Sequence, residues 1–491
     1  MLGHTAPRPS VQDDAPQPLL QSTKLTSKNV GRIYVLTALW AFSMAMWQAQ
    51  MLSFYLYAIN PDTRTVGVAE GVQGITRLSA SMLIGVLVDR LPRNALIMVS
   101  SVLTTAVHAW ILMLVAVPER LPGYPSHRMP LWYGSLALVA LSFALQQNLV
   151  DATFADSVAH GDRVRPETRR RLITYLGLLC APVVMIVMFA VGVVSDGDNP
   201  WTEATLRPIM LVGVCSGLLM GLMMASLDHN ATLGAASEAV HVRDSLQSAQ
   251  AAAEAAALGV SPPQPLPASA AAETTAEVVD ATVEAAAEAA ARSAQCVRSS
   301  IFIYDVLRLL SGGLVVKYWG LFFKEAYGLG PVAVLGIALG TIISMLALTL
   351  AAGFLSGQRV GAGRGAVCFG LLLLCDSFNF ATVYARTVWA DAASWIVREG
   401  ALNGVFGLKK AILMDHTPKS RRGVWNAVDN LQSGFFSGSA IAGGFLIHHF
   451  GTFPLPTMHG LSQPGYRANF FFMSCGFVVA TLAWAPLARV K

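Results

Sequence analysis

The sequence predicts an all-α membrane protein whose transmembrane helices, about twelve in number, form two pseudo-symmetric halves of six. The 491 residues are 54% hydrophobic and only 13% charged, whereas soluble domains carry about 25% charged residues. Apolar windows long enough to cross a bilayer recur along the chain, and a polar stretch separates them into two equal groups. A lipid bilayer is therefore the expected surrounding of this chain.

Each predicted span is a window of about 20 residues with few charges, the length that a helix needs to cross the hydrocarbon core. Glycine and proline occur inside several windows, and transmembrane helices in a bundle tolerate these residues. In the first group the spans lie near 32–57, 68–88, 94–117, 131–153, 170–194 and 206–227. In the second group they lie near 299–325, 331–356, 366–386, 389–413, 424–449 and 468–488.

Composition divides the chain into four parts. Residues 1–31, rich in Pro, Gln and Ser, predict a disordered tail, and residues 32–228 form the first six-helix half. Residues 229–298 are dominated by Ala, Glu and Ser and contain the break "SPPQPLP". We expect a linker here, because the stretch has too little apolar bulk for a core; a small regulatory domain is the alternative. Residues 299–491 form the second half.

Arginine-rich loops predict how the chain is oriented. The connections after the second, fourth, eighth and tenth spans contain "DRLPR", "RVRPETRRR", "QRVGAGR" and "PKSRR". Because loops rich in Lys and Arg stay in the cytoplasm, both termini, these four loops and the linker are expected there. The plasma membrane is the favoured location. The sequon at Asn230 falls on the cytoplasmic side and should carry no glycan.

Other classes of site have little support in the sequence. The six cysteines form no C-x-x-C pair, so we expect free thiols and no metal or cofactor. The modest net charge of +5 does not indicate a nucleic-acid partner. We also expect no enzyme, since the sequence contains neither a G-x-x-x-x-G-K-[ST] loop nor a His/Glu/Asp cluster with hydrolase spacing.

A short motif is repeated at the ends of the fourth and tenth spans. "ATFADSVAHGDRVRPETRRR" and "AILMDHTPKSRR" both place an aspartate four residues after an alanine and close a polar loop on paired arginines. The equivalent positions indicate duplication of a six-helix unit. The motif residues are Asp156, Asp415, Arg421 and Arg422.

The loop "GVLVDRLPRN" after the second span carries a family resemblance. Gly85, Asp89, Arg90 and Arg93 resemble the loop signature G-x-x-x-D-R-x-G-R of the major facilitator superfamily, with Pro92 in place of a glycine. The resemblance implies that superfamily's fold, secondary transport by alternating access, and a cytoplasmic charge network in which this loop helps to close the inner gate. The alternative is a basic turn that only obeys the orientation rule.

Charged and amide side chains inside the spans are candidates for the transport pathway, since a charge costs about 2.5–3.5 kcal/mol at the bilayer centre. We expect Lys317, in "SGGLVVKYWGLFF", to face an aqueous cavity, with a fixed ion pair as the alternative. Glu399 and Asp376 are candidate proton carriers, because a carboxylate in apolar surroundings binds a proton more readily. The candidate pathway residues are Lys317, Glu399, Arg398, Asp376, Gln48, Gln147 and Asp305.

Together these patterns predict a transporter for a small polar or anionic solute, with proton coupling as an open alternative. A transport-inactive receptor or scaffold of the same fold would have an identical pattern of spans and loops. The sequence does not distinguish the two.

Overall fold

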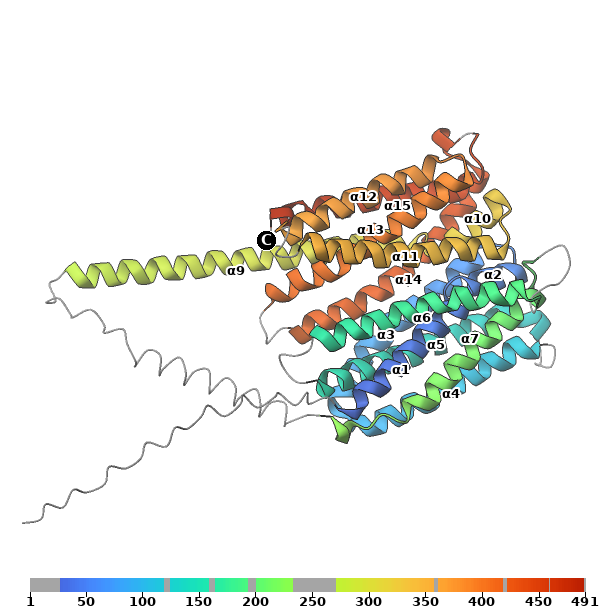
Figure 1. Cartoon of the computed structure of the whole chain (residues 1–491), viewed down its shortest axis with the longest axis horizontal. Coiled ribbons are helices and arrows are strands. Elements are labelled where there is room, and N and C mark those ends of the chain that lie inside the picture. Colours follow the sequence, from blue (N-terminus) through green and yellow to red (C-terminus); the bar gives the residue numbers. More distant parts are fainter. Residues whose placement is uncertain are drawn as a thin grey trace, which may run out of the picture.

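The computed structural model describes residues 27–118, 124–158, 164–192, 200–232, 271–356, 361–417, 422–458 and 460–489. This part of the chain is built of long helices packed side by side (Figure 1). Most of the predicted tail, linker residues 233–270 and Arg421 lie outside the described residues, as do the side chains of Asp89 and Arg422.

The first half contains six spanning units. The first unit is interrupted: a π-helical segment, η1 (Met44–Gln48), separates its two α-helices. Short polar caps start three units. Ser27 Oγ accepts a hydrogen bond from Asn29 N at 3.1 Å, Asp62 Oδ1 accepts one from Arg64 N at 2.9 Å, and Thr202 Oγ1 accepts one from Thr205 N at 3.2 Å. The α-helices are α1 (Lys28–Ser43), α2 (Met51–Ile59), α3 (Thr63–Arg90), α4 (Arg93–Ala116), α5 (Tyr124–Ser157), α6 (Val164–Ala190) and α7 (Glu203–Met224).

The second half also contains six units, and its first unit is broken in the membrane. Helix α9 (Ala271–Gly313) begins inside the predicted linker rather than at residue 299 and stops at a glycine pair, and α10 (Trp319–Tyr327) completes the crossing. Residues 314–318 between them form a turn. The remaining helices are α11 (Pro331–Leu355), α12 (Arg364–Tyr384), α13 (Val388–Asp415), α14 (Arg422–Thr452) and α15 (Pro464–Trp484).

The units correspond in order to the twelve predicted spans. Eight of the described helical segments are long and apolar enough to cross a membrane by themselves. Helices α3, α9, α13 and α14 are not among these eight. Helices α3, α9 and α13 carry buried charged side chains, which lowers their hydropathy and requires partners inside the bundle.

The two halves meet closely along α3 and α14, where glycines let the backbones approach. A Cβ atom added at Gly74 would lie 2.5 Å from the backbone nitrogen of Gly438, and one at Gly434 would lie 2.7 Å from Leu78 Cβ. Close approach of small residues is a common way for membrane helices to associate. The glycine-rich stretch "SGFFSGSAIAGG" of α14 therefore packs against the other half.

The bundle has two distinguishable ends. Helices α3, α5, α11 and α13 end, and α4, α6, α12 and α14 begin, at the end that bears the arginine-rich loops, here called the basic-loop end (left in Figure 1). Helices α2, α10 and the start of α3 lie at the other end, here called the far end. The chain therefore starts and finishes its crossings at the basic-loop end.

Candidate functional site

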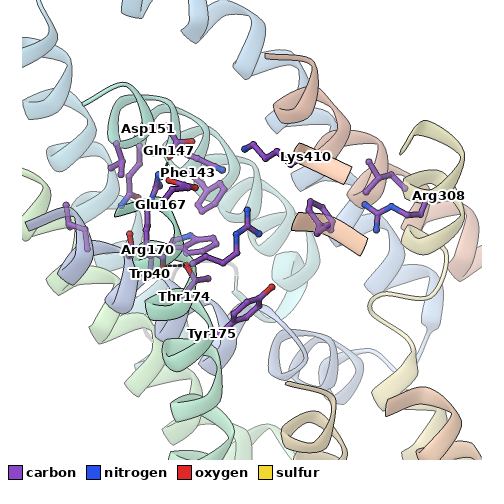
Figure 2. Close-up of a pocket in the computed structure, with 17 residues that line it drawn as sticks. Trp40, Phe143, Gln147, Asp151, Glu167, Arg170, Thr174, Tyr175, Arg308 and Lys410 are labelled. Carbon is purple, nitrogen blue, oxygen red and sulfur yellow. Dashed lines mark hydrogen bonds and ion pairs between the residues drawn. The ribbon is translucent and has the colours of Figure 1, made fainter. Parts of the chain in front are cut away.

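A cavity of about 420 Å³ lies between the two halves near the basic-loop end. Its size falls within the range of about 300–1,000 Å³ that is usual for small-molecule sites. Figure 2 shows Trp40, Phe143 and Arg170 of the first half on one side and Arg308 and Lys410 of the second half on the other. The lining residues are Leu36, Thr37, Trp40, Phe143, Gln146, Gln147, Val150, Asp151, Glu167, Arg170, Arg171, Thr174, Tyr175, Arg308, Leu309, Phe406 and Lys410.

The helices that supply these residues explain the place of the cavity. In the first half, α1, α5 and α6 contribute residues that lie within about four turns of the basic-loop end of each helix. In the second half, α9 and α13 contribute Arg308 and Lys410 from the corresponding depth. A site lined by both halves changes shape whenever one half moves against the other.

Aromatic rings form one wall of the cavity. The rings of Trp40 and Phe143 are stacked with centroids 5.6 Å apart, and the guanidinium of Arg77 covers the Phe143 ring at 4.0 Å. Figure 2 shows Tyr175 below Trp40, next to Thr174. Such rings provide apolar contact area and tolerate a cation on their faces.

The charged groups of the cavity are only partly paired. Arg170 Nη2 lies 2.5 Å from Asp151 Oδ1, and both belong to the first half. Arg308 is 7% exposed and extends toward the cavity (Figure 2), where the Phe406 ring lies 5.1 Å from its guanidinium carbon. Among the described residues, no hydrogen bond is formed by Arg308 Nε.

A buried ion pair joins the halves farther toward the far end. Lys317, in the turn between α9 and α10, places Nζ 3.2 Å from Glu70 Oε2 of α3. The same ammonium donates to the carbonyl oxygens of Gln48 at 2.7 Å and Ala49 at 3.0 Å, where the first unit is interrupted. Glu70 Oε1 accepts a hydrogen bond of 2.8 Å from Ser437 of α14. Both charges are therefore satisfied by groups from opposite halves.

Further hydrogen bonds connect the halves on this side of the molecule. Gln50 Nε2 donates to Val316 O at 3.0 Å, and Trp201 Nε1 donates to Leu329 O at 3.1 Å. Tyr318 Oη lies 3.3 Å from Thr63 O of the first half and 2.9 Å from Ala440 O of its own half. We call the Lys317–Glu70 ion pair and these hydrogen bonds the far-end latch.

Lys317 is not among the residues that line the cavity. Gln48 is buried next to Lys317, not at the cavity. Gln48 Nε2 donates to Gln73 Oε1, and Gln73 Nε2 lies 3.3 Å from Glu70 Oε2. Of the two predicted amides, Gln147 lines the cavity and Gln48 belongs to the surroundings of the latch.

The remaining predicted residues lie inside the second half. Arg398 pairs with the adjacent Glu399, donates from Nε to Asn379 Oδ1 at 2.7 Å, and lies over the Trp395 ring at 4.5 Å. Asp376 is buried on α12. None of Arg398, Glu399 and Asp376 lines the cavity described above.

Asp305 is paired across helices. Lys409 Nζ of α13 lies 2.5 Å from Asp305 Oδ1, and both side chains are buried. Arg308, one turn further along the face of α9 that carries Asp305, lines the cavity instead. Asp305 therefore belongs to an ion pair inside the second half, whereas Arg308 belongs to the cavity between the halves.

The loop and repeat residues form two equivalent ion pairs at the basic-loop end. Arg93 at the start of α4 pairs with Asp156 at the end of α5. Arg364 at the start of α12 pairs with Asp415 at the end of α13, with Nη2 2.8 Å from Oδ2. The third and fourth units of each half are thus fastened in the same way, while the Arg90 side chain is exposed.

Several residues of these sites were not singled out by the sequence analysis. Glu70 is the third residue of the predicted 68–88 span. At that place a charged side chain is expected to reach the water at the end of the helix, so it does not attract notice. Its signal is the surrounding "GVAEGVQG", in which Gly67, Gly71 and Gly74 mark a helix face made for close contact. Lys410 carried no signal beyond its charge. The spacing of three residues between Asp305 and Arg308 predicts one helix face and favours an ion pair between them, but the structure pairs Asp305 with Lys409 instead.

Comparison with known proteins identifies the fold. The sequence matches no protein-family model and no curated protein. A D-xylose–proton symporter superposes with a TM-score of 0.63 at 13% identity, covering 94% of this chain and 98% of that chain. The inward-facing bacterial homologue of the iron transporter ferroportin gives 0.60 at 13% identity, covering 94% and 98%. The nucleoside transporter NupG gives 0.56 at 13% identity, covering 94% and 100%.

These structures share one architecture, and this chain has it over nearly its whole length. The protein has the major facilitator superfamily fold, with about twelve spanning helices in two halves of six. The predicted fold class is confirmed. The chain is a multi-pass membrane protein.

Proposed function

We propose that the protein is a secondary transporter that moves a small polar or anionic solute by alternating access. The observation that carries the proposal is the cavity between the halves, together with the far-end latch that holds the same halves together beyond it. Rocking of the halves would open the latch and close the cavity. The known structures of similar architecture are transporters of D-xylose, nucleosides and metals by their descriptions, which supports transport in general.

The orientation belongs to the same proposal. With the arginine-rich loops and both termini in the cytoplasm, the basic-loop end is the inner end. The structure then corresponds to an inward-facing state, in which the latch closes the outer side. Two of the similar structures are described as inward-facing, the ferroportin homologue and a bacterial homologue of the lysosomal transporter Spinster.

We also propose that transport is coupled to protons and that Glu399 is the proton carrier. Of the three predicted acids, Asp305 is held by buried Lys409 and Asp376 is buried, whereas the Glu399 side chain is 21% exposed beside Arg398. A carboxylate that reaches water and faces a cation can exchange a proton as its surroundings change.

Flux into proteoliposomes tests the transport proposal. Purified full-length protein is reconstituted, and uptake of a sugar, a nucleoside, an amino acid and a carboxylate is measured with and without a proton gradient. Saturable uptake of any one of them supports transport, and gradient-dependent uptake that Glu399→Gln abolishes supports coupling. A protein that binds a solute but moves none of the panel is instead a receptor or scaffold of this fold.

A further inference from the structure

The inter-half cavity carries an excess of positive charge. Four basic and two acidic side chains line it. Arg170 is paired with Asp151 at 2.5 Å, so that among the described lining residues Glu167 is the one remaining acid beside Arg171, Arg308 and Lys410. Within the described residues, none of these three cations forms an ion pair with a carboxylate. The cavity is therefore suited to a negatively charged ligand.

Arg308 is the most informative of these cations because it is buried. Its side chain is 7% exposed, yet Nε makes no hydrogen bond among the described residues. The nearest carboxylate on the same helix face, Asp305, has Lys409 Nζ at 2.5 Å. A buried N–H donor without an acceptor and a largely buried cation without a paired anion are both unfavourable, and an anion in the cavity would supply the acceptor and the opposite charge.

The remaining walls indicate the other part of the ligand. Trp40 and Phe143 present stacked rings on the side that belongs to the first half, and Phe406 lies beneath the Arg308 guanidinium. Rings in such an arrangement bind a flat apolar body by stacking and edge contacts. A simple inorganic anion would leave this wall unused.

We infer that the cavity binds a water-soluble organic anion with a planar apolar body, its anionic group held by Arg308 and its body placed against Trp40 and Phe143. The inference rests on the proposed function, since it names the substrate class of the same cavity. A volume of about 420 Å³ suits a molecule with one or two rings and excludes a phospholipid with two acyl chains. Arg171 and Lys410 raise the local concentration of anions at the cavity.

Equilibrium dialysis with radiolabelled 1-naphthoate tests the inference directly. The full-length protein is used in detergent, with 1-naphthamide as a neutral ligand of nearly the same shape. We expect naphthoate to bind at least about tenfold more tightly than the amide, because both can accept a hydrogen bond from Arg308 but only the anion forms an ion pair with it. Arg308→Gln should weaken naphthoate binding by about tenfold or more and weaken amide binding much less.

Matched variants separate this role from a structural one. Arg308→Lys keeps the charge but loses the planar fork, so it should retain part of the affinity. Arg386→Gln removes an exposed arginine outside the cavity and should bind like the parent. Trp40→Ala should weaken naphthoate and naphthamide binding equally, and this comparison serves if Arg308→Gln fails to fold.

Three results would overturn the inference: no naphthoate binding, equal affinity for acid and amide, or parental binding by a folded Arg308→Gln variant. Flux measurements distinguish this failure from failure of the proposed function. Uptake of a neutral sugar or nucleoside without anion binding would contradict the inference that the substrate is an anion, but it would support the proposal that the protein is a transporter. Anion binding with no flux of any solute keeps the anion site and removes transport.

Discussion

Lys317 Nζ lies 3.2 Å from Glu70 Oε2, and this ion pair connects the second half of the molecule to the first. Both side chains are buried, and each has further partners: two backbone carbonyls for the ammonium, and Ser437 for the carboxylate. A lysine in the middle of a membrane crossing is thus explained by a partner on another helix rather than by contact with bulk water. Because the partner is on the opposite half, the pair must separate if the halves rock apart at this end.

The first prediction concerns this ion pair. Lys317→Gln and Glu70→Gln should each express poorly, because breaking a buried pair from one side costs about 3–5 kcal/mol. The double variant removes both charges and should recover expression and a monodisperse elution profile, measured by fluorescence-detected size exclusion. Arg64→Gln breaks an exposed pair with Asp62 and serves as the control. Normal expression of both single variants would contradict the prediction.

The close contact between α3 and α14 leads to a second prediction. A Cβ at Gly74 would lie 2.5 Å from Gly438 N and 2.7 Å from Ser437 Cβ, so Gly74→Ala should force the halves apart at the latch. The readout is the alkylation rate of a cysteine introduced at Gln50, with the native cysteines replaced. We expect a severalfold faster rate.

Gly336→Ala is the matched control for this experiment. Gly336 is also helical, but no atom lies within 4 Å of an added Cβ. Alanine favours a helix by about 1 kcal/mol over glycine, so the control should be neutral or stabilising. Equal alkylation rates in Gly74→Ala and the parent would mean that the two helices adjust without opening.

A third prediction compares a buried with an exposed ion pair. Arg467 Nη2 lies 3.2 Å from Asp391 Oδ2, with both side chains nearly inaccessible, and Arg467 also donates to Thr382 O and Val383 O. Asp391→Asn should lower thermal stability strongly, since it leaves a guanidinium uncompensated at a cost of about 3–5 kcal/mol.

Asp415→Asn is the comparison for that experiment. Its partner Arg364 is one-third exposed and Asp415 itself is 54% exposed, so the loss should be about 0–1 kcal/mol. Melting temperatures of the two purified variants in the same detergent decide the point. Equal losses would mean that burial does not govern these pairs.

The fourth prediction concerns orientation. An epitope inserted after Ala270 should be reachable only after the membrane is permeabilised, and Asn230 should carry no glycan, because arginine-rich loops stay in the cytoplasm. Antibody labelling of intact and permeabilised cells provides the measurement. Labelling of intact cells would reverse the inner and outer ends used above.

The order of the helices could be read from the sequence because hydropathy depends on local composition. The break of the seventh unit was not predicted, because the apolar window 299–325 has the composition of one continuous span, whereas α9 stops at Gly313 and α10 begins at Trp319. The partner of Lys317 was not predictable in the same way, since Glu70 is distant in sequence and lies near the edge of its predicted span. Only the packing of α3 against the second half brings the two together.

In the candidate site, too, some features could be predicted from local sequence and others depend on how the helices pack. Asp156 and Asp415 were expected to be equivalent from the repeated motif, and their partners Arg93 and Arg364 follow from the same duplication. The cavity itself was not foreseeable, because its walls come from α1, α5, α6, α9 and α13 and depend on how the halves are placed. Of the predicted pathway residues, Gln147 lines it, and the assignment of the others to transport stays a prediction.

Helix α9 runs without a break from the predicted linker to the candidate site. Its 43 residues run from Ala271 to Gly313, so it is about 65 Å long at 1.5 Å per residue. The hydrocarbon core is only about 30 Å thick, and Figure 1 shows the helix projecting well beyond the bundle. Arg308 lies near the inner end of this helix, so a protein or membrane surface that tilted the outer end of the helix as a rigid rod would also move the cation at the cavity wall.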